Sequence, residues 1–260
     1  MAKATPERTI NQAMKWVGYL EKKSNKNLDD FTANAGKNNY TRFNRDYVAE
    51  MKGRKYPGAL GMQWCAAFIS CVFMYEYGVN AAREMLCGDL SCYTPAGAGY
   101  FKKAGRYTPR KKADPQPGDV VYFYSSAKGR IGHVGLVYAV DRTKIYTIEG
   151  NTSGGNSLVT NGGAVWKKAA NKTSSYIDGF GRPLYEQIPI PEDNPAPQPD
   201  TSLGKRTLRK GMKGDDGVTT WAVMVRMVIM AQRPNPLYQT SSAHPNSKRM
   251  EFMVLRPILR

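Results

Sequence analysis

An uncharged apolar run is the clearest element that the hydrophobic pattern predicts. It extends from Trp64 to Tyr75, follows a segment rich in glycine and proline, and is followed by Gly78. Proline and glycine interrupt helices, and glycine is a common residue at a helix C-terminus. We therefore predict one buried helix that begins at Cys65 and is ended by Gly78.

Helices are predicted mainly before residue 105, and strands mainly after residue 116. Apolar residues at helical spacing predict a first amphipathic helix at residues 9–22, and shorter helices are expected at 46–52, 80–86 and 96–104. Short apolar runs separated by turn residues predict strands at 120–124, 133–140, 144–149, 164–168 and 176–180. Helices first and antiparallel strands later predict an α+β fold, with the N-terminal helices packed on an antiparallel sheet.

Composition changes sharply near residue 188. Five prolines lie among polar residues between Ile188 and Asp200, a composition typical of a stiff, extended linker. We expect a folded domain at residues 1–187, a linker at 188–201 and a short C-terminal appendage at 202–260.

The charge is strongly positive. The 260 residues carry a formal net charge of +17, and 41% of them are hydrophobic, which excludes general disorder. Such a field attracts polyanions, including nucleic acid, acidic lipids and the anionic polymers of a bacterial wall. The first residues have no apolar core of the signal-peptide type, and the run at 64–75 is too short to cross a bilayer of about 30 Å. We expect synthesis in the cytoplasm, no membrane insertion, and a separate exit route for any extracellular role.

Cys65 is the first candidate for chemistry. Unpaired backbone N–H groups and the helix dipole favour an anion such as a thiolate at a helix N-terminus. A small buried apolar residue is the alternative interpretation of the same cysteine. A cysteine nucleophile needs a base, and the chain has two histidines, His133 and His244. His133 begins a predicted strand, whereas His244 lies in an irregular tail, so His133 is the candidate base.

Two polar residues follow on a later strand. Glu149 and Asn151 are two residues apart and therefore point to the same side of an extended strand. A hairpin that joins this strand to the strand of His133 would place one of them beside the imidazole, where it would orient the ring. An exposed acid before a turn is the alternative. The four cysteines lack the close pairs of a zinc site, so neither a metal nor a cofactor is expected.

Four sequence blocks together resemble the CHAP family of papain-like cysteine hydrolases, which cleave peptidoglycan and are frequent in phage endolysins. The resemblance implies a papain-like domain with Cys65 as nucleophile, His133 as base, and Glu149 with Asn151 as the orienting pair. It also suggests Gln63 as an oxyanion donor, although in many relatives the glutamine directly precedes the cysteine. The blocks are Trp64 to Phe68, Pro117 to Phe123, Gly132 to Val137 and Ile145 to Asn151.

The predicted function is therefore a peptidoglycan hydrolase that lyses bacterial cell wall, either an N-acetylmuramoyl-L-alanine amidase or a peptide endopeptidase. Release to the wall through a membrane lesion is what the endolysin resemblance suggests. Residues 208–216 also resemble the start of a peptidoglycan-binding repeat, which predicts a partial or atypical binding tail. Two alternatives remain: a basic nucleic-acid-binding protein, which lacks a recognisable nucleic-acid motif here, and a wall-binding protein without catalysis.

Overall fold

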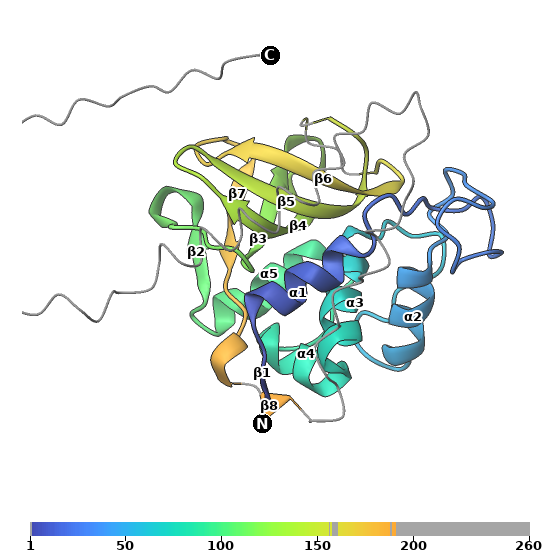
Figure 1. Cartoon of the computed structure of the whole chain (residues 1–260), viewed down its shortest axis with the longest axis horizontal. Helices are drawn as coiled ribbons and strands as arrows, with labels where there is room; N and C mark the ends of the chain where they lie inside the picture. The colour runs from blue at the N-terminus through green and yellow to red at the C-terminus, as the bar shows by residue number, and fades with distance from the viewer. Residues whose placement is uncertain (1, 156, 158–160, 188, 191–260) are drawn as a thin grey trace, which may run out of the picture. The chain divides into compact units, whose positions relative to one another are not determined.

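A six-stranded antiparallel sheet forms one half of the folded part (Figure 1). The computed structural model describes residues 2–155, 157, 161–187 and 189–190. The sheet order is β2-β7-β3-β4-β5-β6. Its strands are β2 (Tyr107–Pro109), β3 (Val120–Ser125), β4 (Arg130–Val140), β5 (Lys144–Thr152), β6 (Ala164–Asn171) and β7 (Ile177–Gly181). All five predicted strands are present, and β2 is an additional short edge strand.

Helices gather on one side of this sheet in Figure 1, which confirms the predicted α+β fold. The central helix α3 packs against its helical neighbours and against β4 and β5. The helices are α1 (Pro6–Met14), α2 (Arg42–Glu50), α3 (Cys65–Tyr77), α4 (Val79–Met85) and α5 (Thr94–Lys103), with short 3-10 turns η1 (Arg110–Lys112), η2 (Ser126–Lys128) and η3 (Tyr185–Gln187). None of the helices in the described ranges is long and apolar enough to cross a membrane.

The prediction for α3 is confirmed at both ends. The helix begins at Cys65, and Gly78 follows it with a φ of 78°, a value that glycine adopts without a steric penalty. Cys71, two turns after Cys65, is fully buried in the core. Because α3 is apolar on nearly all sides, it must be enclosed by other elements. The surrounding helices and the sheet meet that requirement.

The predicted first helix at residues 9–22 is wrong in its bounds. The helix α1 starts earlier, because the Thr5 side chain accepts a hydrogen bond from the Arg8 backbone N–H and Pro6 occupies the first turn. It ends at Met14, and the chain then turns through Gly18, whose φ is 93°. Lys22 lies beyond this turn and pairs as an isolated bridge. The apolar residues after Met14 make tertiary contacts, with Tyr19 fully buried, and do not continue the helix.

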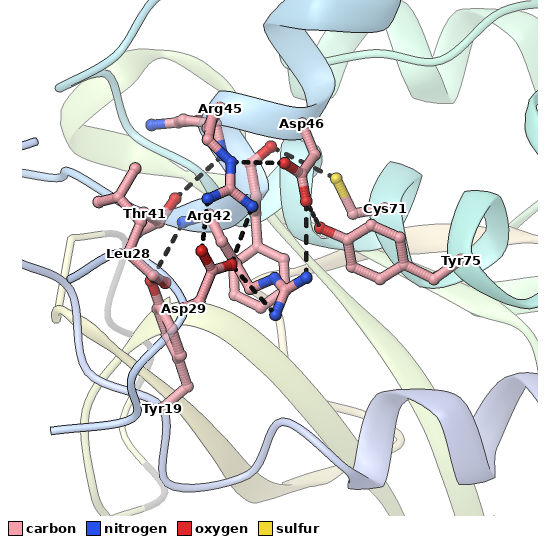
Figure 2. A network of polar contacts seen from close by, with 11 residues as sticks. Tyr19, Leu28, Asp29, Thr41, Arg42, Arg45, Asp46, Cys71 and Tyr75 are labelled. Carbon is pink, nitrogen blue, oxygen red and sulfur yellow. Dashed lines mark hydrogen bonds and ion pairs between the residues drawn. The ribbon is translucent and has the colours of Figure 1, made fainter. Parts of the chain in front are cut away.

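A charged network holds the segment before α2 against α2 and α3 (Figure 2). Arg45 donates two hydrogen bonds to the Asp29 carboxylate, at 2.7 and 2.9 Å. Asp46 accepts a hydrogen bond of 2.5 Å from the Tyr75 hydroxyl on α3. Arg42 lies over the Trp16 ring, 4.4 Å from its centroid. These contacts fix the polar segment between α1 and α2, which has little secondary structure of its own.

The folded region extends slightly beyond the predicted domain end. The short strands β1 (Ala2–Lys3) and β8 (Pro189–Ile190) pair antiparallel, so residues 189–190 belong to the folded unit and not to the predicted linker. Residues 191–260, which include the rest of that linker and the predicted binding tail, lie outside the described residues.

Candidate active site

The start of α3 is held firmly against the sheet. The side chain of Trp64, the residue before the helix, is fully buried, and its indole N–H donates a 3.0 Å hydrogen bond to Glu21. A Cβ added to Gly150 on β5 would lie 2.6 Å from Phe68 Cβ and 2.9 Å from a Trp64 ring carbon. Only glycine permits this close approach. The contact brings the first turn of α3, and with it Cys65, beside β5.

The side chain of Trp64, the N-cap residue of α3, makes no capping hydrogen bond. The first backbone N–H groups of an α-helix have no partner within the helix. At Cys65 these donors stay available to an anion that forms beside the thiol. The thiol itself is largely enclosed, since Cys65 is only 4% exposed.

His133 on β4 and Glu149 on β5 form a buried pair. His133 Nε2 lies 2.9 Å from Glu149 Oε2, and both side chains are almost fully buried. The β4–β5 register pairs Leu136 with Ile148, so Gly135 packs directly against Glu149. A Cβ at Gly135 would lie 2.7 Å from Glu149 Cγ, which explains how the carboxylate finds room beside the imidazole.

A hydroxyl holds the other oxygen of this carboxylate. Thr147 Oγ1 donates a 2.6 Å hydrogen bond to Glu149 Oε1. Sequence analysis missed Thr147, although it lies two residues before Glu149 on the same strand and so on the same side. The two hydrogen bonds fix the position of the carboxylate.

The two neighbours of His133 raise its pKa to about 9. Burial acts in the opposite direction and lowers the pKa, but hydrogen bonding with Cys65 and Glu149 and the charges of both groups outweigh it. The Nδ1 atom makes no hydrogen bond to any described residue, although the Cys65 thiol lies close enough to influence the titration of the ring. With Nε2 on Glu149, the ring can exchange a proton with Cys65 through Nδ1. This arrangement favours a charged imidazole at neutral pH.

Asn151 is placed differently from Glu149. It is fully buried and has a φ of 55°, an unusual value for a residue other than glycine. Neither its amide nitrogen nor its amide oxygen has a hydrogen-bond partner in the part of the chain that the structure describes. Of the two polar residues predicted on this strand, Glu149 is therefore the one that contacts His133.

Gln63 lies on the exposed side of the site. Its Oε1 atom accepts a 2.7 Å hydrogen bond from Lys128 Nζ. Sequence analysis missed Lys128, which lies in the turn before β4 and carries no motif. It also missed Glu21, because an isolated acid followed by lysines gives no sign that it will be buried.

The comparisons with known proteins include a family match that spans the candidate residues. The family model described as "CHAP domain" matches residues 56–151, a span that includes Cys65, His133, Glu149 and Asn151. No curated protein matches the sequence. Among solved structures, the chain is similar to "The crystal structure of Ly7917", with 14% sequence identity and a TM-score of 0.40. The alignment covers 69% of this chain and 62% of that chain, so it spans less than two thirds of the Ly7917 chain.

The motif-based prediction of the family is thereby confirmed, and the α+β architecture is consistent with a papain-like CHAP domain. Residues 56–151 thus match the CHAP-domain family, whose members are generally cysteine- and histidine-dependent amidohydrolases or peptidases.

Proposed function

We propose that this protein is a peptidoglycan hydrolase in which Cys65 is the nucleophile and His133 is the general base and acid. One observation carries the proposal. The imidazole of His133 is buried between the thiol at the start of α3 and the carboxylate of Glu149, and both groups raise its pKa. A thiol, an imidazole and an orienting carboxylate are the parts that nucleophilic catalysis by cysteine needs.

The reaction proceeds through a thioester. In the resting ion pair the proton of the Cys65 thiol lies on His133, and the thiolate attacks the carbonyl carbon of the substrate, whose π electrons move onto oxygen. The oxyanion returns its electron pair, the C–N bond breaks, and His133 protonates the departing amine. His133 then takes a proton from water, the resulting hydroxide attacks the thioester, and the acid product leaves as the thiolate and the imidazolium are restored.

Glu149 orients the ring and stabilises its charge during these steps. The carboxylate accepts the Nε2 hydrogen bond, which leaves Nδ1 directed to the thiol side, and its negative charge stabilises the imidazolium. The uncapped backbone N–H groups at the start of α3 are the main candidate donors to the oxyanion. Gln63, at the exposed side, is the candidate side-chain donor.

The substrate bond is either the amide that joins muramic acid to the stem peptide or a peptide bond within the stem or cross-bridge. The same catalytic residues serve both reactions, because the chemistry at the carbonyl is the same. The net charge of +17 supports attraction to anionic wall polymers. We further propose that the protein is made in the cytoplasm and acts on the wall after release.

The test compares wild-type protein with Cys65→Ala and His133→Ala on purified peptidoglycan. We expect the suspension to clear with wild type alone, and mass spectrometry of the released fragments to identify the new amino terminus and hence the bond. Cys87→Ala, which alters a half-buried cysteine far along the chain from the motif, is the matched control and should keep activity. Equal behaviour of wild type and both site variants, with all proteins folded, would refute the proposal.

A further inference from the structure

Lys128 is a charged side chain at the exposed side of the candidate site, and the mechanism has no role for it. It ends the turn η2, between β3 and β4. Its Nζ atom donates a 2.7 Å hydrogen bond to Gln63 Oε1 and a longer one, at 3.5 Å, to the Gly132 carbonyl oxygen. The contact thus joins two segments 65 residues apart in the sequence.

The path of the Lys128 side chain depends on its neighbours. A Cβ at Gly132 would lie 3.1 Å from Lys128 Cδ and 2.6 Å from Ser125 Cβ. The missing side chain at Gly132, directly before His133, therefore leaves the room in which Lys128 lies. Gly129, with a φ of 62°, closes the turn that brings the lysine back toward the site.

The chemistry of the contact decides how the Gln63 amide is oriented. An ammonium group has donors only, so it must pair with the amide oxygen of Gln63. The amide nitrogen, with its two N–H groups, then points away from the lysine and stays available. Lys128 also interacts electrostatically with Cys65, which places the lysine and the amide it holds near the thiol.

We propose that Lys128 is a positioning residue that fixes the Gln63 amide with its N–H groups directed to the oxyanion formed at Cys65. This inference rests on the proposed hydrolase function. Without the lysine, the exposed glutamine would rotate freely, and its amide would present oxygen or nitrogen to the oxyanion. The amide oxygen would repel the developing negative charge. The orientation of the Gln63 amide therefore determines whether it stabilises the oxyanion.

A competing explanation is that the Lys128 charge acts directly on the Cys65 thiolate. The two explanations differ in two measurements. If Lys128 acts through Gln63, removing Gln63 should abolish the effect of removing Lys128 on kcat, and the alkylation rate of Cys65 should change far less than kcat does. If Lys128 acts on the thiolate, the effects should add, and the alkylation rate of Cys65 should change with Lys128.

The experiment is a double-mutant cycle on the full chain with Lys128→Met, Gln63→Ala and both together. Rates of amine release from soluble peptidoglycan fragments give kcat and KM, and peptide mapping after brief iodoacetamide treatment gives the alkylation rate of Cys65. Lys128→Arg tests rescue by another donor, and Arg130→Met removes the neighbouring cation as a matched control. Thermal unfolding shows that each variant is folded.

We expect Lys128→Met to lower kcat by about 10-fold with little change in KM, which is less than the roughly 100- to 1,000-fold loss when a principal oxyanion donor is removed. Lys128→Arg should recover part of kcat, Arg130→Met should match wild type, and Lys128→Met should have no further effect in the Gln63→Ala protein. Additive losses, or alkylation of Cys65 that slows as much as kcat falls in Lys128→Met, would overturn the inference and leave the hydrolase function standing. If the wild-type protein is inactive, both the hydrolase function and the role of Lys128 are refuted.

Discussion

The contact between Glu149 and His133 gives the sharpest prediction. Glu149→Gln keeps the size of the side chain and an oxygen that accepts a hydrogen bond, but it removes the negative charge beside the ring. The pair lies 2.9 Å apart and is almost fully buried, so little water screens the interaction. We expect the substitution to lower the pKa of His133 while the fold is kept.

The size of this change follows from the geometry. Two unit charges whose centres are about 4 Å apart interact by about 4 kcal/mol at an effective dielectric constant near 20. An opposite charge at such a distance changes a pKa by about 1 to 3 in practice. The pKa of His133 is about 9 in the intact site. In Glu149→Gln it should therefore fall to between roughly 6 and 8.

Nuclear magnetic resonance of the histidine rings measures this directly and does not depend on activity. The chain has two histidines, so His244→Gln leaves His133 as the single ring signal to titrate. In wild type the ring should stay charged from neutral pH up to about pH 9 and lose its proton above it. If the proposed mechanism holds, the basic limb of the kcat/KM profile should move to lower pH in Glu149→Gln, together with the ring titration.

The reasoning would be refuted by a His133 ring that titrates near 6.5 in wild type and does not change in Glu149→Gln. That result would mean that the carboxylate does not stabilise the imidazolium. A ring pKa that falls as expected, in a protein without any hydrolytic activity, would confirm the electrostatics and contradict the catalytic proposal.

Two further substitutions test how the site is built. Gly135→Ala should push Glu149 away from the imidazole, since the new Cβ would lie 2.7 Å from Glu149 Cγ, and should cost about 1 to 3 kcal/mol of stability along with most of the activity. Gly99→Ala, where nothing lies within 4 Å, is its control and should keep activity and stability in thermal unfolding. Glu21→Ala should leave the buried Trp64 N–H without a partner and lower the free energy of unfolding by about 1 to 3 kcal/mol in urea titrations, so an unchanged midpoint would contradict that role.

Several elements were predictable from local sequence signals. The helix α3 was predictable because a long uncharged apolar run bounded by glycines is typical of a buried helix. The strands were predictable because turn residues separate their apolar runs. The end of α1 was not predictable in this way. Residues 16–20 include apolar side chains at spacing that fits a helix. Trp16 instead packs against α2 and α3, and Tyr19, beyond the turn at Gly18, is fully buried beside β6. Contacts in the folded chain cover these apolar side chains without a helix, so tertiary packing overrides the helical spacing of the sequence.

The candidate site was predictable only in part. Cys65 at a helix start and His133 on a strand follow from the order of motifs, and the strand period places Glu149 and Asn151 on one side. Which of these two lies beside the imidazole depends on the register of β4 with β5 and on the space that Gly135 leaves. The lysine that holds Gln63 has no motif at all, because its partner lies 65 residues away.

The sequence by itself predicted the CHAP-domain match, the fold class and the two candidate residues Cys65 and His133, since these depend on local periodicity, on turn residues and on ordered motifs. The tertiary structure alone decided the partners: Glu149 and not Asn151 at the imidazole, Glu21 at Trp64, and Lys128 at Gln63. The physical reason is that hydrogen bonds and charge interactions act over a few ångströms in space. The sequence shows that two groups are close only when both lie on the same helix or strand.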